Sequence, residues 1–314
     1  MHILLQFLIL AAGFVMLIKG ADWFVDGASS IAAKFGIPQL VIGLTIVAMG
    51  TSAPEAAVSI SAAVKGSADI TIGNIVGSNI MNVLVILGVA SVIIPIAVSV
   101  STIKYEMPFM IGISGVLLLL GLDGNITRLD GLILIALFIA YLAYLFIQAK
   151  RGRTDAEDRP QEVVIWKAVL FLLVGLVMII LGSNFAVDAA SEIAKFFGMS
   201  ERFIGLTVVA LGTSLPELCT SVMAARKGNA DIAIGNIVGS NVFNILFVVG
   251  LSSMVINVPY QPKFIFDMCI AIAAAVLLLL FCILGRKKLR RWGGALMLLG
   301  YAGYFTYIAF FTNN

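Results

Sequence analysis

Residues 42–90 read IGLTIVAMGTSAPEAAVSISAAVKGSADITIGNIVGSNIMNVLVILGVA, and residues 204–252 read IGLTVVALGTSLPELCTSVMAARKGNADIAIGNIVGSNVFNILFVVGLS. They align without a gap at an offset of 162 residues, and 30 of their 49 positions are identical. The matches include Gly, Ser, Thr, Asn, Pro and Glu inside apolar runs, whereas a duplication kept only for folding would need only apolar character to match. The sequence therefore predicts an internal repeat whose polar positions have a function.

The composition places this repeat in a membrane. Of 314 residues, 61% are hydrophobic and 12% are charged, whereas soluble domains are about 45–50% apolar and about 25% charged. A transmembrane helix needs about 20 apolar residues, and the apolar runs are continuous rather than alternating as in a β-barrel. We therefore predict an all-α polytopic membrane protein, with the lipid bilayer as a partner and no nucleic acid. The sequence does not indicate an oligomeric state.

The apolar runs predict ten transmembrane helices, separated by short polar segments. A charged stretch at 149–163 divides the chain into a first five-helix repeat (1–148) and a second (164–314), and we expect it to be a flexible linker. The predicted spans are 3–33, 38–64, 70–97, 105–121, 131–148, 164–197, 203–225, 231–257, 264–284 and 292–311.

The repeats are predicted to be inverted, because an offset of 162 residues contains five spans, an odd number. In this arrangement, 14 of the 20 lysines and arginines fall on one side of the membrane and 5 on the other, with Lys19 inside the first span. The positive-inside rule then places the linker in the cytoplasm and both termini outside the cell membrane.

A GTSxPE motif lies within an apolar run in each copy, at 50–55 and 212–217. Proline lacks an N–H, so a carbonyl near Gly50 or Gly212 is freed and the helix is expected to break there. Broken helices at this depth line cavities where ions use the freed carbonyls; the alternative is an ordinary kink in which hydroxyls bond the helix backbone. The expected carbonyl donors are Ala48, Ala210, Thr51 and Thr213.

Glu55 and Glu217 are the two acids predicted to lie deep in the membrane. A carboxylate there costs at least about 2.5–3.5 kcal/mol, and no Lys or Arg is expected at matching depth. The partner is then a proton or a metal cation; the structural alternative is two protonated glutamates hydrogen-bonded across an interface. Carboxylate, hydroxyl and carbonyl oxygens suit Ca²⁺ and Na⁺, while the single histidine, His2, argues against soft metals and hydrolytic catalysis.

A second motif, GNxxGSN, follows at 73–79 and 235–241. Ser78 and Asn82 are four residues apart and share one helical face, as do their copies Ser240 and Asn244. This polar stripe either faces a cation or forms interhelical hydrogen bonds. Asp69 and Asp231 precede the two helices and are predicted to be N-caps.

These motifs resemble the α-repeats of the cation/calcium exchanger superfamily, in particular its prokaryotic Na⁺/Ca²⁺ exchanger branch. The resemblance covers essentially the whole chain and implies an antiporter with transported Ca²⁺ and Na⁺, no cofactor and no enzymatic activity. It implies a metal site formed by Glu55, Glu217, Thr51, Thr213, Ser52, Ser214, Ser78, Ser240, Asn82, Asn244 and the carbonyls of Ala48 and Ala210.

Two departures from the family pattern matter. Many members carry an aspartate where this chain has Asn244, so the site here lacks a third acid. The linker is also too short for a cytosolic Ca²⁺-sensing domain. Proton-coupled or K⁺-dependent Ca²⁺ exchange therefore stay open as alternatives, and a cation channel is disfavoured because paired broken helices in inverted repeats are typical of carriers.

Overall fold

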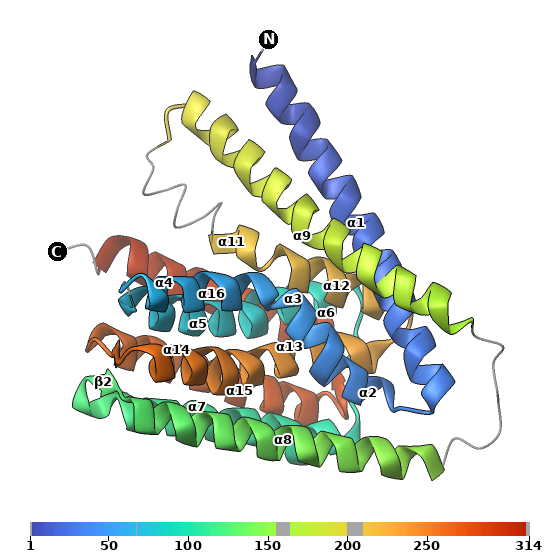
Figure 1. Cartoon of the computed structure of the whole chain (residues 1–314). Helices are drawn as coiled ribbons and strands as arrows, with labels where there is room; N and C mark the ends of the chain where they lie inside the picture. Colours follow the sequence, from blue (N-terminus) through green and yellow to red (C-terminus); the bar gives the residue numbers. More distant parts are fainter. Residues whose placement is uncertain (1, 67, 155–163, 200–209, 312–314) are drawn as a thin grey trace.

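The computed structural model describes residues 2–66, 68–154, 164–199 and 210–311, and nearly all of them are helical (Figure 1). Two long helices, α1 (His2–Phe35) and α9 (Ile165–Phe196), run side by side across the other helices. The remaining helices are α2 (Gln39–Ile42), η1 (Gly43–Val47), α3 (Ala48–Thr51), α4 (Ala53–Val64), α5 (Asp69–Met81), η2 (Asn82–Leu87), α6 (Gly88–Ile93), η3 (Thr102–Glu106), α7 (Met107–Leu120), η4 (Gly121–Asp123), α8 (Arg128–Thr154), α11 (Ala210–Thr213), α12 (Leu215–Arg226), α13 (Ala230–Phe243), η6 (Asn244–Val249), α14 (Gly250–Val255), α15 (Lys263–Leu284) and α16 (Arg291–Phe311).

Seven helices in the described part of the chain are long and apolar enough to cross a membrane. The segments α2–α3 and α4, which are bent by 52° at their junction, pass the same test only when taken together. Leu8 on α1, Leu119 on α7 and Leu299 on α16 are more than half exposed, as expected for side chains that face lipid. The predicted polytopic helical class is thus confirmed. Of the two other predicted spans, 292–311 corresponds to α16, which is rich in glycine and tyrosine and is not among the seven, and 203–225 begins outside the described residues.

Several predicted boundaries were wrong. The third and eighth spans end at Ile93 and Val255 rather than at 97 and 257, because the chain turns to extended backbone there and forms short strands. Helix α8 continues to Thr154, six residues into the predicted linker, because no proline occurs before residue 160. The rest of that linker, 155–163, lies outside the described residues.

Two short antiparallel ladders join the halves of the chain. Strand β1 (Ile96–Ala97) pairs with β4 (Lys288–Leu289), and β2 (Asn125–Ile126) pairs with β3 (Val258–Pro259). Each ladder therefore connects a first-half strand to a second-half strand.

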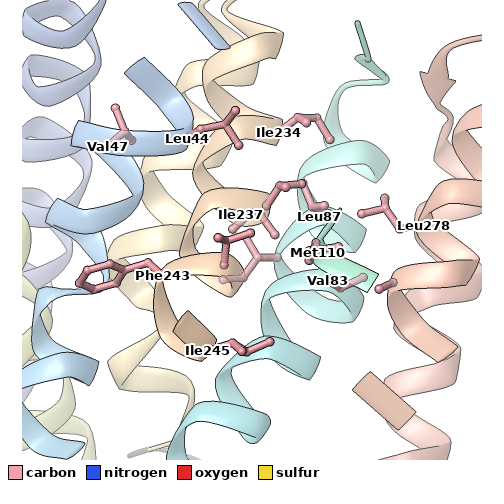
Figure 2. Close-up of a cluster of buried hydrophobic side chains, with 14 of the residues drawn as sticks. Leu44, Val47, Val83, Leu87, Met110, Ile234, Ile237, Phe243, Ile245 and Leu278 are labelled. Atoms are coloured by element: carbon pink, nitrogen blue, oxygen red, sulfur yellow. The ribbon is translucent and has the colours of Figure 1, made fainter. Parts of the chain in front are cut away.

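The two GNxxGSN helices form the centre of the molecule. The span α13–η6–α14 is 94% buried and α5–η2–α6 is 78% buried, against 17% for α1. Figure 2 shows that the core around them mixes both halves: Leu44, Val83 and Met110 come from the first, and Ile237 and Phe243 from the second. Neither half therefore has a complete core without the other.

Helices α1 and α9 approach closely because glycines lie at their crossing points. A Cβ at Gly175 would lie 2.5 Å from the Phe24 backbone nitrogen and 2.7 Å from the Gly20 oxygen. Small residues permit this backbone contact between membrane helices.

We expect Gly175→Ala to lower the stability of the protein by about 1–3 kcal/mol, because the new methyl group would overpack against the α1 backbone. The measurement is the Tm of the purified protein in detergent. Gly115→Ala is the matched control, since no atom of a described residue lies within 4 Å of a Cβ at that position in α7. Equal Tm values for the two variants would contradict the close packing of α1 on α9.

Candidate cation site

The GTSxPE motifs break their helices, as predicted. Helix α3 ends at Thr51, Ser52 has φ −85° and ψ 7°, and α4 starts at Ala53 with Pro54 in its first turn. In the second copy Ser214 has φ −95° and ψ 3° between α11 and α12. In both copies a glutamate lies in the first turn of the following helix.

One of the carbonyls freed by proline has found a partner. Gly212 O, four residues before Pro216, accepts a hydrogen bond of 2.8 Å from Ser183 Oγ on α9. The first copy has Ala21 at the position equivalent to Ser183, so it lacks this hydroxyl. The two breaks are therefore held differently, although their motifs match.

Ser183→Ala is expected to destabilise the protein by about 1–3 kcal/mol, because it would leave Gly212 O buried without its donor. Thermal unfolding in detergent measures this. Ser191→Ala in the same helix is the control: within the described residues Ser191 Oγ is buried without a hydrogen-bond partner, so its removal should cost little. A Ser183→Ala variant as stable as Ser191→Ala would show that Gly212 O does not need the hydroxyl.

Both predicted glutamates are buried, with Glu55 2% and Glu217 1% exposed. Ser52 Oγ, from the other half of the chain, donates a 2.8 Å hydrogen bond to Glu217 Oε1. Within the described part of the chain neither glutamate forms an ion pair with Lys or Arg, and Glu55 Oε2 and Glu217 Oε2 have no hydrogen-bond partner. This is an arrangement that a bound cation would stabilise.

Asn82 and Asn244 present their amide oxygens to the same region. Asn82 Nδ2 donates to Asn241 Oδ1 (3.0 Å), and Asn244 Nδ2 donates to Asn79 Oδ1 (3.1 Å). The two donor amides are thereby occupied, while Asn82 Oδ1 and Asn244 Oδ1 have no partner among the described residues. Each side chain is thus oriented as a carbonyl-type oxygen ligand.

The residues that orient them, Asn79 and Asn241, were missing from the predicted site. Asn79 Nδ2 donates to Asn241 O (3.4 Å), and Asn241 Nδ2 donates to Asn79 O (3.2 Å). The signal was present in the sequence, because both residues belong to GNxxGSN and are equivalent under the repeat. Asn79 precedes Asn82 by three residues and Asn241 precedes Asn244 by three, so each pair shares one helical face.

Asn74 and Asn236 tie each GNxxGSN helix to the preceding broken helix. Asn74 Nδ2 lies 2.8 Å from Ser59 Oγ and 3.3 Å from Glu55 O, and Asn236 Nδ2 makes the equivalent contacts in the second copy, to Ser221 Oγ and Glu217 O. The asparagine stripe is therefore partly interhelical, as the alternative interpretation held.

The predicted hydroxyl ligands have different surroundings. Thr51 Oγ1 lies 3.0 Å from Asn236 Oδ1 and 3.1 Å from Val47 O, so it joins the two halves and also bonds its own helix. Ser240 Oγ donates to the predicted carbonyl ligand Ala48 O (3.4 Å). Ser214 Oγ is buried without a partner in the described residues, whereas Ser78 and Thr213 line a cavity. Ala210 starts α11, and its side chain is outside the described part.

This cavity, of about 260 Å³, contains predicted site residues from both halves of the chain. It is lined by Asn74, Ser78, Thr213, Asp267 and Tyr304, together with apolar residues. On the equivalent face of the other copy, α13 is packed against the start of the first broken helix, where a Cβ at Gly239 would lie 2.7 Å from Leu44 O.

The assembled donor set consists of two carboxylates, amide oxygens, hydroxyls and backbone carbonyls. Within the described ranges no group of three or more His, Cys, Asp or Glu side chains could hold a metal ion. The site is thus made of hard oxygens with only two formal negative charges, which suits Ca²⁺ or Na⁺ rather than a transition metal.

Comparison with known proteins agrees with this chemistry. The family model described as sodium/calcium exchanger protein matches residues 5–147 and 167–310. The chain belongs to the sodium/calcium exchanger family. It is 32% identical over 343 aligned residues to the sodium/calcium exchanger MaX1 of Methanosarcina acetivorans, with 96% of this chain and 98% of MaX1 covered. It is 38% identical to the inner membrane protein YrbG of Escherichia coli (strain K12), with 89% of each chain covered.

The solved structure of the sodium-calcium exchanger NCX_Mj, soaked without Na⁺ and Ca²⁺, has the same fold. It matches with a TM-score of 0.85 and 31% identity, covering 98% of this chain and 99% of NCX_Mj. As a prokaryotic member of a family of transporters, this exchanger is a multi-pass membrane protein that exchanges Ca²⁺ for another cation.

Proposed function

We propose that this exchanger is a secondary active antiporter that exchanges Na⁺ for Ca²⁺ by alternating access to a shared site between Glu55 and Glu217. The observation that carries the proposal is a set of five buried oxygens without hydrogen-bond partners in the described part of the chain. Since buried acceptors are normally satisfied, these unsatisfied oxygens on the two repeated motifs support a transported cation as the missing partner. These atoms are Glu55 Oε2, Glu217 Oε2, Asn82 Oδ1, Asn244 Oδ1 and Ser214 Oγ.

The proposed ligand set extends to the rest of the two motifs. The hydroxyls of Thr51 and Ser52 and their copies, and the carbonyls that precede them, flank the glutamates on the broken helices. Ser78 and Ser240 flank them on α5 and α13. The twelve ligands proposed for Ca²⁺ and Na⁺ are Glu55, Glu217, Thr51, Thr213, Ser52, Ser214, Ser78, Ser240, Asn82, Asn244, Ala48 and Ala210.

The charge of the site accounts for the coupling of Na⁺ transport to Ca²⁺ transport. Two ionised glutamates with one Ca²⁺ make a neutral site (−2 + 2 = 0), whereas three Na⁺ give +1 (−2 + 3 = +1). Both ions use the same carboxylates, so joint occupancy is disfavoured. An empty site would leave two desolvated carboxylates facing each other, which opposes the crossing of the unloaded carrier. Exchange of three Na⁺ for one Ca²⁺ would then move net charge.

We infer ten transmembrane helices in two inverted five-helix repeats, with both termini outside and the segment 149–163 in the cytoplasm. Reciprocal contacts at the 162-residue offset, such as those of Asn79 and Asn241, support the inversion. In this orientation the cavity at Ser78 and Asp267 faces outward and the packed face of α13 faces the cytoplasm. The described state is then the outward-facing one, and the inward-facing state would exchange the roles of the two halves.

Flux into proteoliposomes tests the coupling ion. Vesicles loaded with Na⁺ and diluted into Na⁺-free medium should accumulate ⁴⁵Ca²⁺, and valinomycin with inward K⁺ flow should accelerate uptake, because a positive interior favours the net export of one charge per cycle. Uptake that follows a pH gradient without Na⁺ would contradict Na⁺ coupling in favour of H⁺, and an absolute requirement for K⁺ on the Na⁺ side would establish K⁺-dependent exchange instead.

A further inference from the structure

A third carboxylate is buried in the described chain, away from the central site. Glu106, at the end of η3, is 2% exposed. Tyr144 OH donates a 2.8 Å hydrogen bond to Glu106 Oε1, and Gln148 Nε2 donates to Tyr144 OH. Glu106 Oε2 has no hydrogen-bond partner among the described residues. Its position at the start of a predicted span did not indicate that it would be buried.

Glu106 lines a cavity of about 140 Å³ that contains a second acid, Asp231. Asp231 was predicted to be the N-cap of its helix, but Asn229 holds that position and Asp231 lies in the first turn. N-capping of the helix therefore does not explain why Asp231 lies at the cavity.

The other polar atoms in the wall are hard oxygens. Ser99 and Ser101 line the same cavity, as does Gln148, whose amide nitrogen is occupied by Tyr144. Among the described residues of this wall there is no lysine or arginine. Glu106 also lines a second cavity, of about 340 Å³, together with Lys104, but the two side chains form no ion pair in the described chain. A single proton would neutralise one of the two acids and leave the polar space between them unfilled, whereas a divalent cation would neutralise both.

We propose that Glu106 and Asp231, with the oxygens of Ser99, Ser101 and Gln148, form a second cation site that binds Ca²⁺ at the cytoplasmic end of the transport path. The inference takes its sidedness from the proposed function. In the proposed orientation the polar segments before Glu106 and before Asp231 both lie on the cytoplasmic side, so an ion would reach this cavity before it reached Glu55 and Glu217.

The cavity lies next to the segment that covers the central site on the proposed cytoplasmic side. Leu40, Val41 and Leu44 of α2 and η1 form its apolar wall. The same segment packs on α13, where a Cβ at Gly235 would lie 3.0 Å from Gly43 Cα. An ion held by Glu106 and Asp231 would therefore contact the element that covers the central site from the inside.

The other half of the chain has a related pair at the open cavity. Tyr304 OH donates a 2.9 Å hydrogen bond to Asp267 Oδ1, and both residues line the cavity that reaches Ser78 and Thr213. Asp267 lies on α15 and Tyr304 on α16, the second-half counterparts of α7 and α8. An acid held by a tyrosine thus lies beside each access side of the central site, which is what a capture position for cations requires.

Equilibrium binding of ⁴⁵Ca²⁺ tests the site independently of transport. The purified double variant Glu55→Gln/Glu217→Gln, used as the background, should keep one class of Ca²⁺ sites. Adding Glu106→Gln or Asp231→Asn to this background should weaken the remaining Ca²⁺ binding by about tenfold or more. Glu192→Gln, an exposed acid paired with Lys195, is the matched control and should leave it unchanged. Absence of residual binding in the background, with a normal Tm, would overturn the proposal.

Vesicles of defined orientation test the sidedness. With Glu106→Gln alone, the KM for Ca²⁺ at the cytoplasmic face, measured in everted membrane vesicles, should rise about tenfold, while the KM at the outer face, measured in right-side-out vesicles, should stay within about twofold of that of the parent protein. An equal rise at both faces would overturn an inner site, as would a shift of the pH dependence without a change in Ca²⁺ binding. If the parent protein binds Ca²⁺ at Glu106 but shows no exchange, the proposed function fails while this site stands.

Discussion

Replacing Glu55 or Glu217 by glutamine is expected to abolish Na⁺-driven ⁴⁵Ca²⁺ uptake in proteoliposomes. Each substitution keeps the shape of the side chain but removes half of the negative charge, so that a bound Ca²⁺ would leave a buried net charge of +1. Losing the partner of a buried charge costs about 3–5 kcal/mol, which corresponds to a loss of occupancy of two orders of magnitude or more.

The two glutamates should behave alike although their surroundings differ. Ser52 Oγ donates a hydrogen bond to Glu217 Oε1, whereas Ser214 Oγ has no partner among the described residues. Ser52→Ala should therefore weaken transport more than Ser214→Ala in the state described. Glu192→Gln controls for the change of residue type and should transport normally. Near-normal uptake by Glu55→Gln or Glu217→Gln, in protein of unchanged Tm, would contradict the assignment of the site.

Asn79→Ala and Asn241→Ala are expected to lower the apparent affinity for Ca²⁺ by about 10–100-fold, because loss of a residue that orients a metal ligand typically lowers metal affinity by this factor. Each alanine would remove the acceptor that holds the amide of Asn244 or Asn82. The released side chain could then rotate its oxygen away from the ion. The measurement is the Ca²⁺ concentration dependence of Na⁺-driven uptake.

A structural role alone would lower the Tm and the amount of active protein without changing the KM. Asn79→Asp separates these possibilities, because it keeps the acceptor for Asn244 while removing the donor to Asn241 O, and should largely preserve the KM. Asn125→Ala, an exposed position in β2, is the control for asparagine replacement. Unchanged KM values for both Asn79→Ala and Asn241→Ala would contradict the orienting role.

Much of the site could be read from the residues themselves. A doubled GTSxPE motif predicted both helix breaks, because proline cannot donate the backbone bond wherever it lies in the fold. Burial of Glu55 and Glu217 followed from their place inside apolar runs. The resemblance carried by these motifs led to the family that the comparisons established. All of these inferences depend on local chemistry or on a repeat that is visible in one dimension.

Other features depended on partners that are distant in sequence. Ser183 supplies the donor for Gly212 O from a different helix, and Asn241 orients Asn82 from the other half of the chain. The burial of Glu106 was missed for the same reason: a position near the start of a span indicates an interfacial residue, whereas Tyr144 and α2 cover it in the folded molecule.

By itself, the sequence determined that this protein lies in a membrane, that it is duplicated, and that two glutamates without cationic neighbours are placed in its apolar interior. These properties are set by composition and by local backbone chemistry. Only the tertiary structure decided which oxygens are left without partners and which face of the site is covered. A hydrogen bond between distant residues and a close helix contact at a glycine each require two separate segments to lie side by side. The sequence is compatible with many such pairs of segments, and the folded chain forms only some of them.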